Sequence, residues 1–395
     1  MAMASVAIVG GGGHVGLPLS IVSAESGLKT YAFDISADVV ETINSGTMPF
    51  IEKGATQKLQ EVLRTGNLVV TTDPSCISSA SYVVIVIGTP VDEYLSPNPN
   101  FVIKSILDLK PFFNSEQTII LRSTIFPGVT KKVIERLDKE FPGIKVAYCP
   151  ERIVEGQALV ELRTLPQIIG ANNIESFESA RRLFQHIGVE SLHSSTETAE
   201  FAKLFTNVWR YIKFAAANQF WMMANDHGVD FEDVRRVMVY NYPRAEDLPH
   251  AGFSAGPCLF KDTMQLAAIV QHNFPLGHAA MMINEGTPGY LVQQLKKSFS
   301  LSGMTVGILG MSYKGNIDDI RSSLAYKLRK LLLFECKEVL ISDPYVADDR
   351  IIELELIIQE SDLLIIGAPH DDYKELLINK PLIDIWGITR YKVVI

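Results

Sequence analysis

The sequence has 395 residues, of which 47% are hydrophobic and 21% are charged, and its formal net charge is −9. This length predicts two or three domains with ordinary cores, and an acidic chain without a long basic run is not typical of a nucleic-acid-binding protein. The apolar runs have the length of strands, well below the ~18 residues of a membrane-spanning helix. The N-terminus leads directly into a strand pattern and lacks the features of a signal peptide, so we expect neither membrane insertion nor export.

The four cysteines are widely scattered, at Cys76, Cys149, Cys258 and Cys336. They form no CxxC pair and no disulfide-like spacing. We therefore expect no metal site, and a location in the reducing cytoplasm.

Strands and helices alternate in the first part of the chain. The run HVGLPLSIVSAESG predicts a helix that stops at Gly27. Apolar runs predict strands at 5–10, 29–34, 67–72, 82–88, 118–124 and 144–150. Near-continuous apolar strands separated by helices indicate a parallel sheet with both faces covered.

The middle of the chain is helical and the last part returns to alternation. Helices are predicted at 197–219, 231–240 and 277–299, without a strand signal from about 196 to 300, and such a segment suits dimer packing. The last part predicts strands at 304–310, 338–343, 363–369 and 390–395 and helices at 321–334 and 351–359. The fold class is therefore α/β, with domains at 1–195, 196–300 and 301–395.

The segment GGGGHVG (10–16) contains G-x-G-x-x-G as Gly11, Gly13 and Gly16, between a predicted strand and a predicted helix. These glycines allow a tight turn, close approach of a pyrophosphate and helix–strand packing, and the helix N-terminus then faces the phosphates. Asp34 ends the next strand, where a carboxylate accepts a hydrogen bond from a ribose 2′-hydroxyl and repels a 2′-phosphate. The pattern predicts a Rossmann-type domain that binds NAD rather than NADP, and the alternative is a glycine-rich turn without a ligand.

Several polar residues occupy positions where ligands bind in such folds. Lys203 and Asn207 lie four residues apart on one face of an otherwise apolar helix. Burying a lysine is costly unless it is paired or used, so the pair either holds a substrate hydroxyl and a water or forms a surface stripe. Thr124 and the pair Glu151 and Arg152 follow strand ends, where open α/β sheets bind ligands. Each of these alone is equally explained as an ordinary loop residue.

Two later segments carry further candidates. GMSYKGNIDDIRSS (310–323) places Lys314 and Arg321 at a strand-to-helix junction, where cations can meet phosphate or simply be solvated. Two α/β parts suggest two nucleotides, the cofactor and part of the substrate. In GFSAGPCLFKDT (252–263), Cys258 is either a nucleophile or a small apolar residue in a tight loop.

Taken together, these segments resemble the UDP-glucose/UDP-N-acetylmannosamine 6-dehydrogenase family of nucleotide-sugar dehydrogenases. The similarity runs from about Val6 to Trp386 and includes GGGGHVG, GTPVD (88–92), STIFPG (123–128), CPERI (149–153), KLFTN (203–207), GFSAGPCLFKD and GMSYKGNIDDIRSS. The resemblance implies an NAD domain, a helical dimerisation domain and a UDP-binding domain in a homodimer. It also implies a four-electron oxidation of a sugar C6 alcohol to a carboxylate with two NAD.

The resemblance also implies a set of site residues. The catalytic residues would be Cys258 as nucleophile with Lys203, Asn207, Asp262, Thr124 and Glu151. NAD would contact Gly11, Gly13, His14, Val15, Gly16, Asp34, Thr89, Pro90, Thr124 and Arg321. The UDP-sugar substrate would contact Glu151, Arg152, Lys203, Asn207, Phe253, Gly256, Cys258 and Lys314, and Arg244 would reach the substrate of the partner subunit.

This reaction explains why a cysteine is needed. A second hydride can leave only from a tetrahedral carbon, and a thiolate that adds to the intermediate aldehyde makes one as a thiohemiacetal. Hydride loss then gives a thioester, which water hydrolyses. Lys203 and Asn207 would stabilise the oxyanion, and Asp262 with an ordered water would relay protons.

Different segments of the sequence resemble different substrate branches of the family. His14 replaces a common tyrosine, and Pro257 and Leu259 are unusual neighbours for the cysteine. GTPVDEYLSPN (88–98), CPERI, GAPHDDY (367–373) and DIW (384–386) look like the N-acetylhexosamine branch, whereas the Lys-Asp end of the cysteine loop looks like the UDP-glucose branch. We expect a UDP-N-acetylhexosamine, with UDP-N-acetylmannosamine favoured and UDP-glucose as the alternative.

Two other functions are compatible with part of the sequence. A two-electron hydroxyacid dehydrogenase of the 6-phosphogluconate or 3-hydroxyisobutyrate type shares the NAD domain and the Lys-x-x-x-Asn helix, but it needs neither Cys258 nor residues 304–395. A non-catalytic regulator that binds NAD and a nucleotide sugar would be expected to have damaged catalytic residues, and here they are intact.

Overall fold

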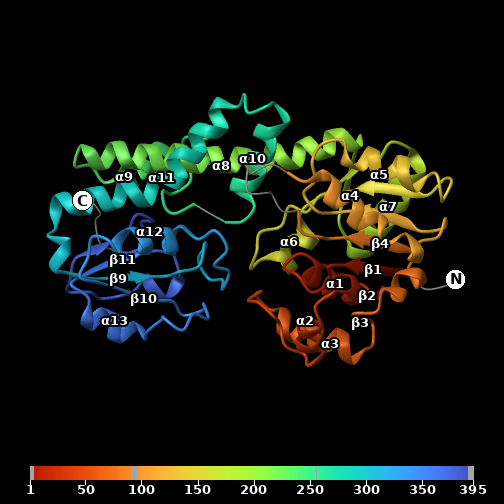
Figure 1. Cartoon of the computed structure of the whole chain (residues 1–395), viewed down its shortest axis with the longest axis horizontal. Coiled ribbons are helices and arrows are strands. Elements are labelled where there is room, and N and C mark those ends of the chain that lie inside the picture. Colours follow the sequence, from red (N-terminus) through yellow and green to blue (C-terminus); the bar gives the residue numbers. More distant parts are fainter. Residues whose placement is uncertain (1–3, 90–96, 255, 390–395) are drawn as a thin grey trace. The chain divides into compact units, whose positions relative to one another are not determined.

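The computed structural model describes residues 4–89, 97–254 and 256–389. It contains two compact units, Met1–Thr206 and Asn207–Ile395 (Figure 1). The boundary between them falls inside one long helix, α8 (Thr196–Asp226). The predicted strand at 390–395 lies outside the described residues, as does Pro90, and the three-domain division stays a prediction.

The first unit is built on an eight-stranded sheet with the order β3-β2-β1-β4-β5-β6-β7-β8. Its strands are β1 (Ser5–Val9), β2 (Lys29–Phe33), β3 (Leu68–Thr71), β4 (Tyr82–Ile85), β5 (Thr118–Leu121), β6 (Lys145–Tyr148), β7 (Gln167–Gly170) and β8 (Ser191–Ser194). All neighbours pair in parallel except β6 and β7, which are antiparallel. The expected parallel sheet is therefore present, with one reversed step near its edge.

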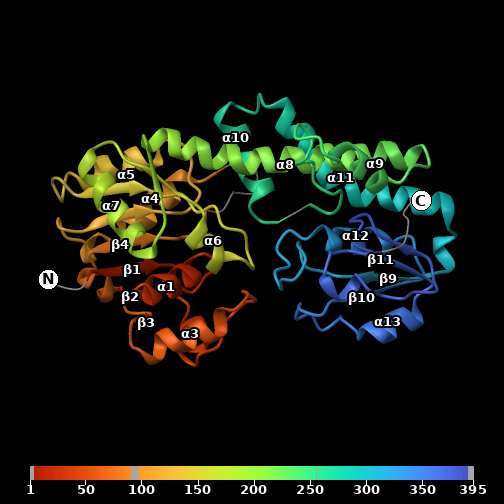
Figure 2. The same ribbon diagram turned by 180° about the vertical axis from the view of Figure 1, so that it is seen from behind.

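Helices cover both faces of this sheet, as near-continuous apolar strands require. They are α1 (Gly16–Glu25), α2 (Ala37–Asn44), α3 (Ala55–Arg64), α4 (Pro99–Leu107), α5 (Val129–Leu137), α6 (Ala158–Thr164) and α7 (Ile174–Ile187), with 3-10 turns η1 (Pro74–Ser79) and η2 (Lys110–Phe112). One core joins the sheet to α1, α3, α6 and α7, and a second joins its other face to α4 and α5. Both views show α1 and α3 on one side and α4 and α5 on the other (Figures 1 and 2).

Strands β7 and β8 were not predicted. Strand β8 is the edge of the sheet and its four residues, SLHS, are partly or fully exposed, with Leu192 61% exposed. An edge strand has no covered face to require an apolar run, so its sequence carries little strand signal.

The second unit contains a smaller, fully parallel sheet with the order β10-β9-β11-β12. Its strands are β9 (Thr305–Leu309), β10 (Glu338–Ser342), β11 (Leu363–Ile366) and β12 (Leu382–Ile383). Its further elements are α9 (Phe231–Val239), α10 (Leu259–Ile269), α11 (Pro275–Ser298), η3 (Leu301–Gly303), α12 (Leu324–Leu332), α13 (Leu354–Glu360) and η4 (Asp371–Tyr373). One face packs on α11 and α12 and the other on α13 (Figure 1). Helix α12 begins later than predicted, because Ser323 caps it by accepting from the Ala325 amide.

The two sheets share a topology that places their ligand loops. In the first sheet β1 lies between β2 and β4, and in the second β9 lies between β10 and β11. The connection that leaves β1 runs to one side along its sheet and the connection that leaves β4 runs to the other, and β9 and β11 differ in the same way. Open α/β sheets bind ligands at such a switch point. None of the described helices combines the length and the apolar composition needed to cross a lipid bilayer.

Candidate active site

The turn between β1 and α1 is shaped for a dinucleotide. A Cβ on Gly16 would lie 2.0 Å from the Gly10 carbonyl oxygen, so only glycine fits there. A Cβ on Gly13 would meet protein only at 3.7 Å, so a side chain at this exposed position would fill the space above the turn. Val15 precedes α1 and no side chain caps the first amides of the helix. These amides and the bare turn fit a pyrophosphate, and Val15 itself is half-buried.

Asp34 is fixed at the carboxyl end of β2. Its Oδ2 accepts from the Gly12 amide at 2.9 Å and its Oδ1 accepts from the Ser36 amide at 3.1 Å. The carboxylate remains half-exposed, so it can still accept from a ribose diol. Ile35 follows it with a side chain that is 89% exposed, an apolar surface on which a flat ring can stack. The sequence did not single out Ile35, although its place directly after Asp34 is a usable signal.

His14 links the glycine turn to the loop after β6. Its Nδ1 lies 2.6 Å from the Glu155 carboxylate, and its ring centroid lies 4.1 Å from that of Phe50. The same loop is held by buried Glu52, which accepts from the Gly156 amide at 3.0 Å and whose pKa is raised by burial. The residue that departs from the common tyrosine is thus anchored by an acid and an aromatic ring.

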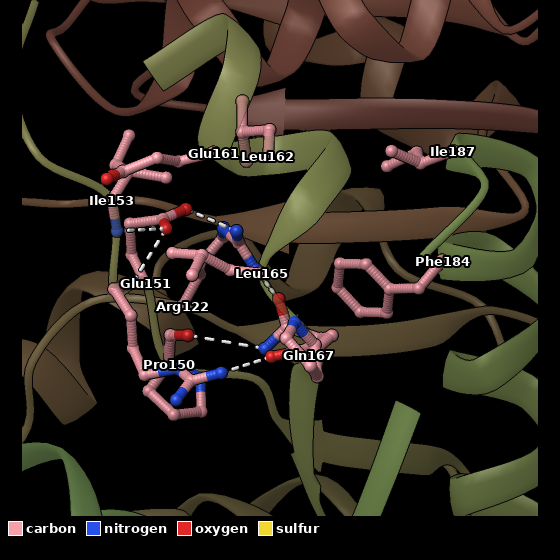
Figure 3. Close-up of a pocket in the computed structure, with 12 residues that line it drawn as sticks. Arg122, Pro150, Glu151, Ile153, Glu161, Leu162, Leu165, Gln167, Phe184 and Ile187 are labelled. Atoms are coloured by element: carbon pink, nitrogen blue, oxygen red, sulfur yellow. Dashed lines mark hydrogen bonds and ion pairs between the residues drawn. The ribbon is translucent and has the colours of Figure 1, made fainter. Parts of the chain in front are cut away.

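Glu151 is immobilised by a buried arginine (Figure 3). Arg122 is 1% exposed, pairs with Glu151, and donates to the Gln167 side chain at 2.8 Å and to the Cys149 carbonyl at 3.2 Å. The Glu151 carboxylate also accepts from the amides of Arg152 at 2.7 Å and Ile153 at 2.9 Å. One cation and two backbone donors therefore fix the carboxylate in place.

The same network lines a small pocket, and the rest of its wall combines Glu161 with apolar side chains such as Leu162, Leu165 and Phe184 (Figure 3). The Arg122 guanidinium lies 5.5 Å from the centre of the Phe184 ring. The Arg152 side chain also lines the pocket and donates to the Pro166 carbonyl. Arg122 was not identified from the sequence. Its position directly after an apolar strand was the one feature that could have indicated a role.

Glu200 on α8 fixes the loop that carries Thr124. Helix α5 begins after Gly128, which offers no side-chain cap. Instead the fully buried Glu200 carboxylate accepts from the Gly128 amide at 2.7 Å, the Thr130 amide at 2.9 Å and the Thr130 hydroxyl at 2.6 Å. Burial raises the pKa of Glu200, which these donors oppose. Lys203, 8% exposed, follows Glu200 by one turn of the helix.

The four cysteines of the chain differ sharply in exposure. Burial raises the pKa of Cys76 and of Cys336 to about 11, and that of Cys149 to about 12. Cys258 is exposed and occupies the N-cap position of α10. A helix N-terminus favours a thiolate. The Cys258 thiol is therefore open to solvent at the start of a helix, and its role as the nucleophile stays a prediction.

Asp262 lies one turn along α10 from Cys258 and contacts Asn207 of α8. Asp262 is fully buried, and its Oδ2 accepts from the Asn207 amide at 2.6 Å. The Lys261 ammonium lies 3.6 Å from its other oxygen. The Asn207 side chain therefore orients Asp262, in addition to any part it takes with a substrate.

The loop before Cys258 packs against two loops of the smaller sheet. Gly252, at φ +145°, lies against the Trp386 ring, where a Cβ would come within 2.3 Å of a ring carbon. Gly256, at φ +112°, lies against the Tyr313 ring in the same way, at 2.9 Å. The structure thus joins three segments that the sequence singled out separately. The Phe253 ring is 1% exposed and meets Trp386 edge-on, so it belongs to the core and not to an open ligand surface.

The remaining predicted ligand residues lie in loops. Lys314 is half-buried after β9, and Thr89 is half-buried after β4. Arg321 forms a two-pronged pair with the buried Asp319, whose Oδ2 accepts from its Nε at 2.9 Å and its Nη2 at 2.6 Å. Arg244 is exposed between α9 and α10, with its guanidinium 5.5 Å from the Tyr242 ring centre. The roles of these residues stay predictions.

Family models match the chain almost throughout. Three models of the UDP-glucose/GDP-mannose dehydrogenase family fit it in order: the NAD binding domain at residues 4–188, the central domain at 197–286 and the UDP binding domain at 307–391.

Individual relatives agree with the family models. UDP-N-acetyl-D-mannosamine dehydrogenase of Pyrococcus horikoshii is 31% identical over 377 residues, covering 92% of this chain and 89% of the relative. A solved structure of UDP-D-ManNAc dehydrogenase from the same organism matches with a TM-score of 0.90 and 28% identity, over 99% of this chain and 97% of the other. A UDP-glucose dehydrogenase structure from Pyrobaculum islandicum also has a TM-score of 0.90, with 24% identity over 98% and 95% of the two chains, which shows the shared fold.

We expect selective alkylation of Cys258. At pH 8 the other three thiols, with pKa values raised to about 11 or 12, contain little thiolate, so brief iodoacetamide treatment should add one carbamidomethyl group per chain by intact mass. Cys258→Ser should block the addition and the matched Cys336→Ser should not. Equal labelling of Cys258→Ser and wild type would contradict the assignment.

Replacing Asp34 should weaken NAD use and relax discrimination against NADP. Asp34→Ala removes a charged acceptor for the ribose diol and the repulsion of a 2′-phosphate, so kcat/KM for NAD should fall by about 10- to 100-fold while that for NADP changes little or rises. Steady-state kinetics with both cofactors measure this. The exposed Asp38→Ala in α2 is the matched control and should leave the NAD/NADP ratio unchanged.

Proposed function

The chain belongs to the UDP-glucose/GDP-mannose dehydrogenase family and is an NAD-dependent UDP-sugar dehydrogenase, and we propose that it oxidises the C6 alcohol of UDP-N-acetyl-D-mannosamine to the carboxylate. The observation that supports a four-electron oxidation is Cys258, an exposed thiol at the start of α10. The buried carboxylate of Asp262 follows it by one turn of the helix. An oxidation that stops at the aldehyde or ketone needs no such thiol.

The choice of sugar rests on two supports. GAPHDDY, CPERI and DIW resemble the N-acetylhexosamine branch, and the Pyrococcus horikoshii relative is a UDP-N-acetyl-D-mannosamine dehydrogenase at 31% identity. The Pyrobaculum islandicum UDP-glucose dehydrogenase, at 24% identity, supports the fold alone. UDP-glucose is the alternative substrate.

The turn 10–16 and Asp34 would hold NAD, which would supply the hydride acceptor for each of the two oxidations. Between them the Cys258 thiolate adds to the C6 aldehyde, forming a C–S bond and a thiohemiacetal whose oxygen needs stabilisation. Loss of the second hydride leaves a thioester, and water then displaces the thiolate and yields the carboxylate. Overall one alcohol, two NAD⁺ and one water give a carboxylate, two NADH and three protons.

The chain's own groups supply orientation and proton transfer. Lys203 and Asn207 stabilise the thiohemiacetal oxygen, and Asp262 exchanges protons through an ordered water. Thr124 and Glu151 hold the hydrolytic water, and Arg122 and Glu200 support them by fixing their loops. Lys314 neutralises the diphosphate of the substrate at the carboxyl edge of the smaller sheet.

We also propose that two copies of the chain pair through the central helices, in the cytoplasm. Helices α8, α9 and α11 and the residue just beyond α9 carry apolar side chains that a monomer would expose to water: Trp209 (57% exposed), Phe220 (43%), Met223 (55%), Val237 (68%), Tyr240 (76%) and Met282 (70%). Several large apolar side chains exposed on the helices of one segment are typical of a subunit interface. Arg244 lies in the segment after α9, which suits its predicted reach to the partner's substrate.

The products formed per sugar test the reaction. With excess NAD and limiting UDP-N-acetylmannosamine, wild type should form two NADH per sugar, and UDP-glucose and UDP-N-acetylglucosamine should react at least about tenfold more slowly. Cys258→Ala should lose the uronic acid product, because the second hydride has no tetrahedral carbon to leave from. One NADH per sugar from wild type would refute the cysteine route, and faster turnover of UDP-glucose would reassign the substrate.

The dimer has a direct test. Trp209→Glu with Val237→Glu should convert a dimer to a monomer in size-exclusion chromatography with light scattering, because two charges would be buried in an apolar interface. Leu377→Glu, at an 88% exposed apolar position beyond η4, is the matched control and should leave the mass unchanged. A wild-type monomer at micromolar concentration would contradict the proposal.

A further inference from the structure

His370 is a fully buried histidine that the reaction does not use. It follows β11 in GAPHDDY and lies under the loop after β9. The Asn316 amide donates to its Nδ1 at 2.9 Å, and its Nε2 lies 3.1 Å from Oδ2 of Asp343. A backbone amide can only donate, so Nδ1 carries no proton and Nε2–H donates to the carboxylate. One ring thus joins the loops that follow β9, β10 and β11.

Asp343 holds the start of the loop after β9. Its Oδ2 accepts from the Met311 amide at 2.6 Å and from the Ser312 amide at 3.2 Å. Burial opposes ionisation, but the bonds from His370 and the backbone amides together lower the pKa of Asp343. The carboxylate therefore depends on His370 for one of the donors that keep it charged in the interior.

Asn316 holds the other end of this loop. It has a left-handed backbone, at φ +62°, which a non-glycine residue adopts at some cost. Its side chain donates to the Asp371 carboxylate at 2.8 Å and accepts from the Asp371 amide at 2.9 Å. With the bond to His370, two neighbouring residues of GAPHDDY fix Asn316.

The loop 311–316, held at both ends, carries one residue predicted to bind the substrate and one that contacts the cysteine loop. Lys314 is the predicted diphosphate ligand, and the Tyr313 ring lies against Gly256, two residues before Cys258. Inside the loop the Ser312 hydroxyl donates to the Lys314 carbonyl at 2.6 Å, so the backbone at Lys314 is held as well.

We propose that His370 is a positioning residue for UDP binding: it holds residues 311–316 in the conformation that presents Lys314 to the diphosphate and Tyr313 to the cysteine loop. It does so without touching the substrate. This rests on the proposed placement of the diphosphate at the carboxyl edge of the smaller sheet.

The competing explanation is that His370 only fills the core. Its ring meets those of Tyr345 and Tyr373 edge-on, at centroid distances of 5.0 and 5.4 Å, as a buried aromatic ring would. If His370 only filled the core, phenylalanine could replace it with little effect on the affinity for UDP. If His370 positions the loop, phenylalanine should weaken UDP binding, because the Asn316 amide and the Asp343 carboxylate would both lose a hydrogen-bond partner.

Three substitutions of His370 distinguish the contribution of its hydrogen bond with Asn316 from that of its hydrogen bond with Asp343. His370→Asn can keep an acceptor near the position of Nδ1, His370→Gln can keep a donor near that of Nε2, and His370→Phe keeps neither. Calorimetry with UDP alone should show affinity within about threefold of wild type for the Asn variant. The Gln and Phe variants should lose about tenfold or more, the size expected when a loop hydrogen bond is left unmade.

The full-length protein supplies the controls. Affinity for NAD and kcat at saturating substrate should stay near wild type in the His370 variants while KM for the UDP-sugar rises, a split that a general loss of folding would not give. Tyr373→Phe changes a ring that contacts His370 but none of the loop bonds, and should leave UDP affinity unchanged. If the Phe variant does not fold, the comparison of the Asn and Gln variants still decides.

Each remaining outcome overturns a distinct statement. If His370→Phe binds UDP as wild type does, or if every variant weakens UDP and NAD equally, the positioning role is wrong and the site is unaffected. If wild type binds no UDP, or if Lys314→Ala binds it unchanged, the placement of the diphosphate fails and the role of His370 fails with it.

Discussion

Each sheet relies on one carboxylate at the end of its second strand to hold the loop that follows its first strand. Asp34 accepts from the Gly12 amide, and Asp343 accepts from the Met311 and Ser312 amides. The amides of a loop that leaves the carboxyl edge of a parallel sheet have no neighbouring strand to pair with. The carboxylate satisfies them and fixes the loop before any ligand arrives, so both ligand loops are preorganised in the same way.

The two carboxylates differ in what remains available, and this suits the two sheets to different nucleotides. Asp34 is half-exposed and keeps acceptor capacity for a ribose diol. Asp343 is 6% exposed and its oxygens are used by backbone amides and His370. The second sheet therefore cannot offer its carboxylate to a ribose in the way that the first can. It offers instead a clamped loop with Lys314, which suits a diphosphate.

The sequence predicted the parts of the molecule that are encoded locally. The glycine turn, Asp34 and the alternation of strands and helices follow from short-range patterns, whereas the role of Cys258 is implied by the resemblance and stays a prediction. Arg122, Glu200 and His370 were not indicated, because their importance lies in partners 29, 70 and 54 residues away in the chain. The local sequence around a single arginine, glutamate or histidine does not indicate which distant residue it will contact. An edge strand such as β8 lacks the covered face that would give it an apolar pattern.

These supporting groups contribute orientation more than stability. Taking a charge such as that of Glu200 or Arg122 out of water costs free energy that its partners recover only in part, so a buried pair is weak ground for arguing stability. What each pair does provide is a fixed direction: Glu200 sets the start of α5 beyond Thr124, and Arg122 sets the Glu151 carboxylate. The reaction proposed above, with two hydride transfers and a hydrolysis at one carbon, needs its water and oxyanion groups in place throughout, and preorganised polar groups act without rearranging at each step. In the proposed reaction the buried charges therefore act one step removed from the substrate, by fixing the loop of Thr124 and the carboxylate of Glu151.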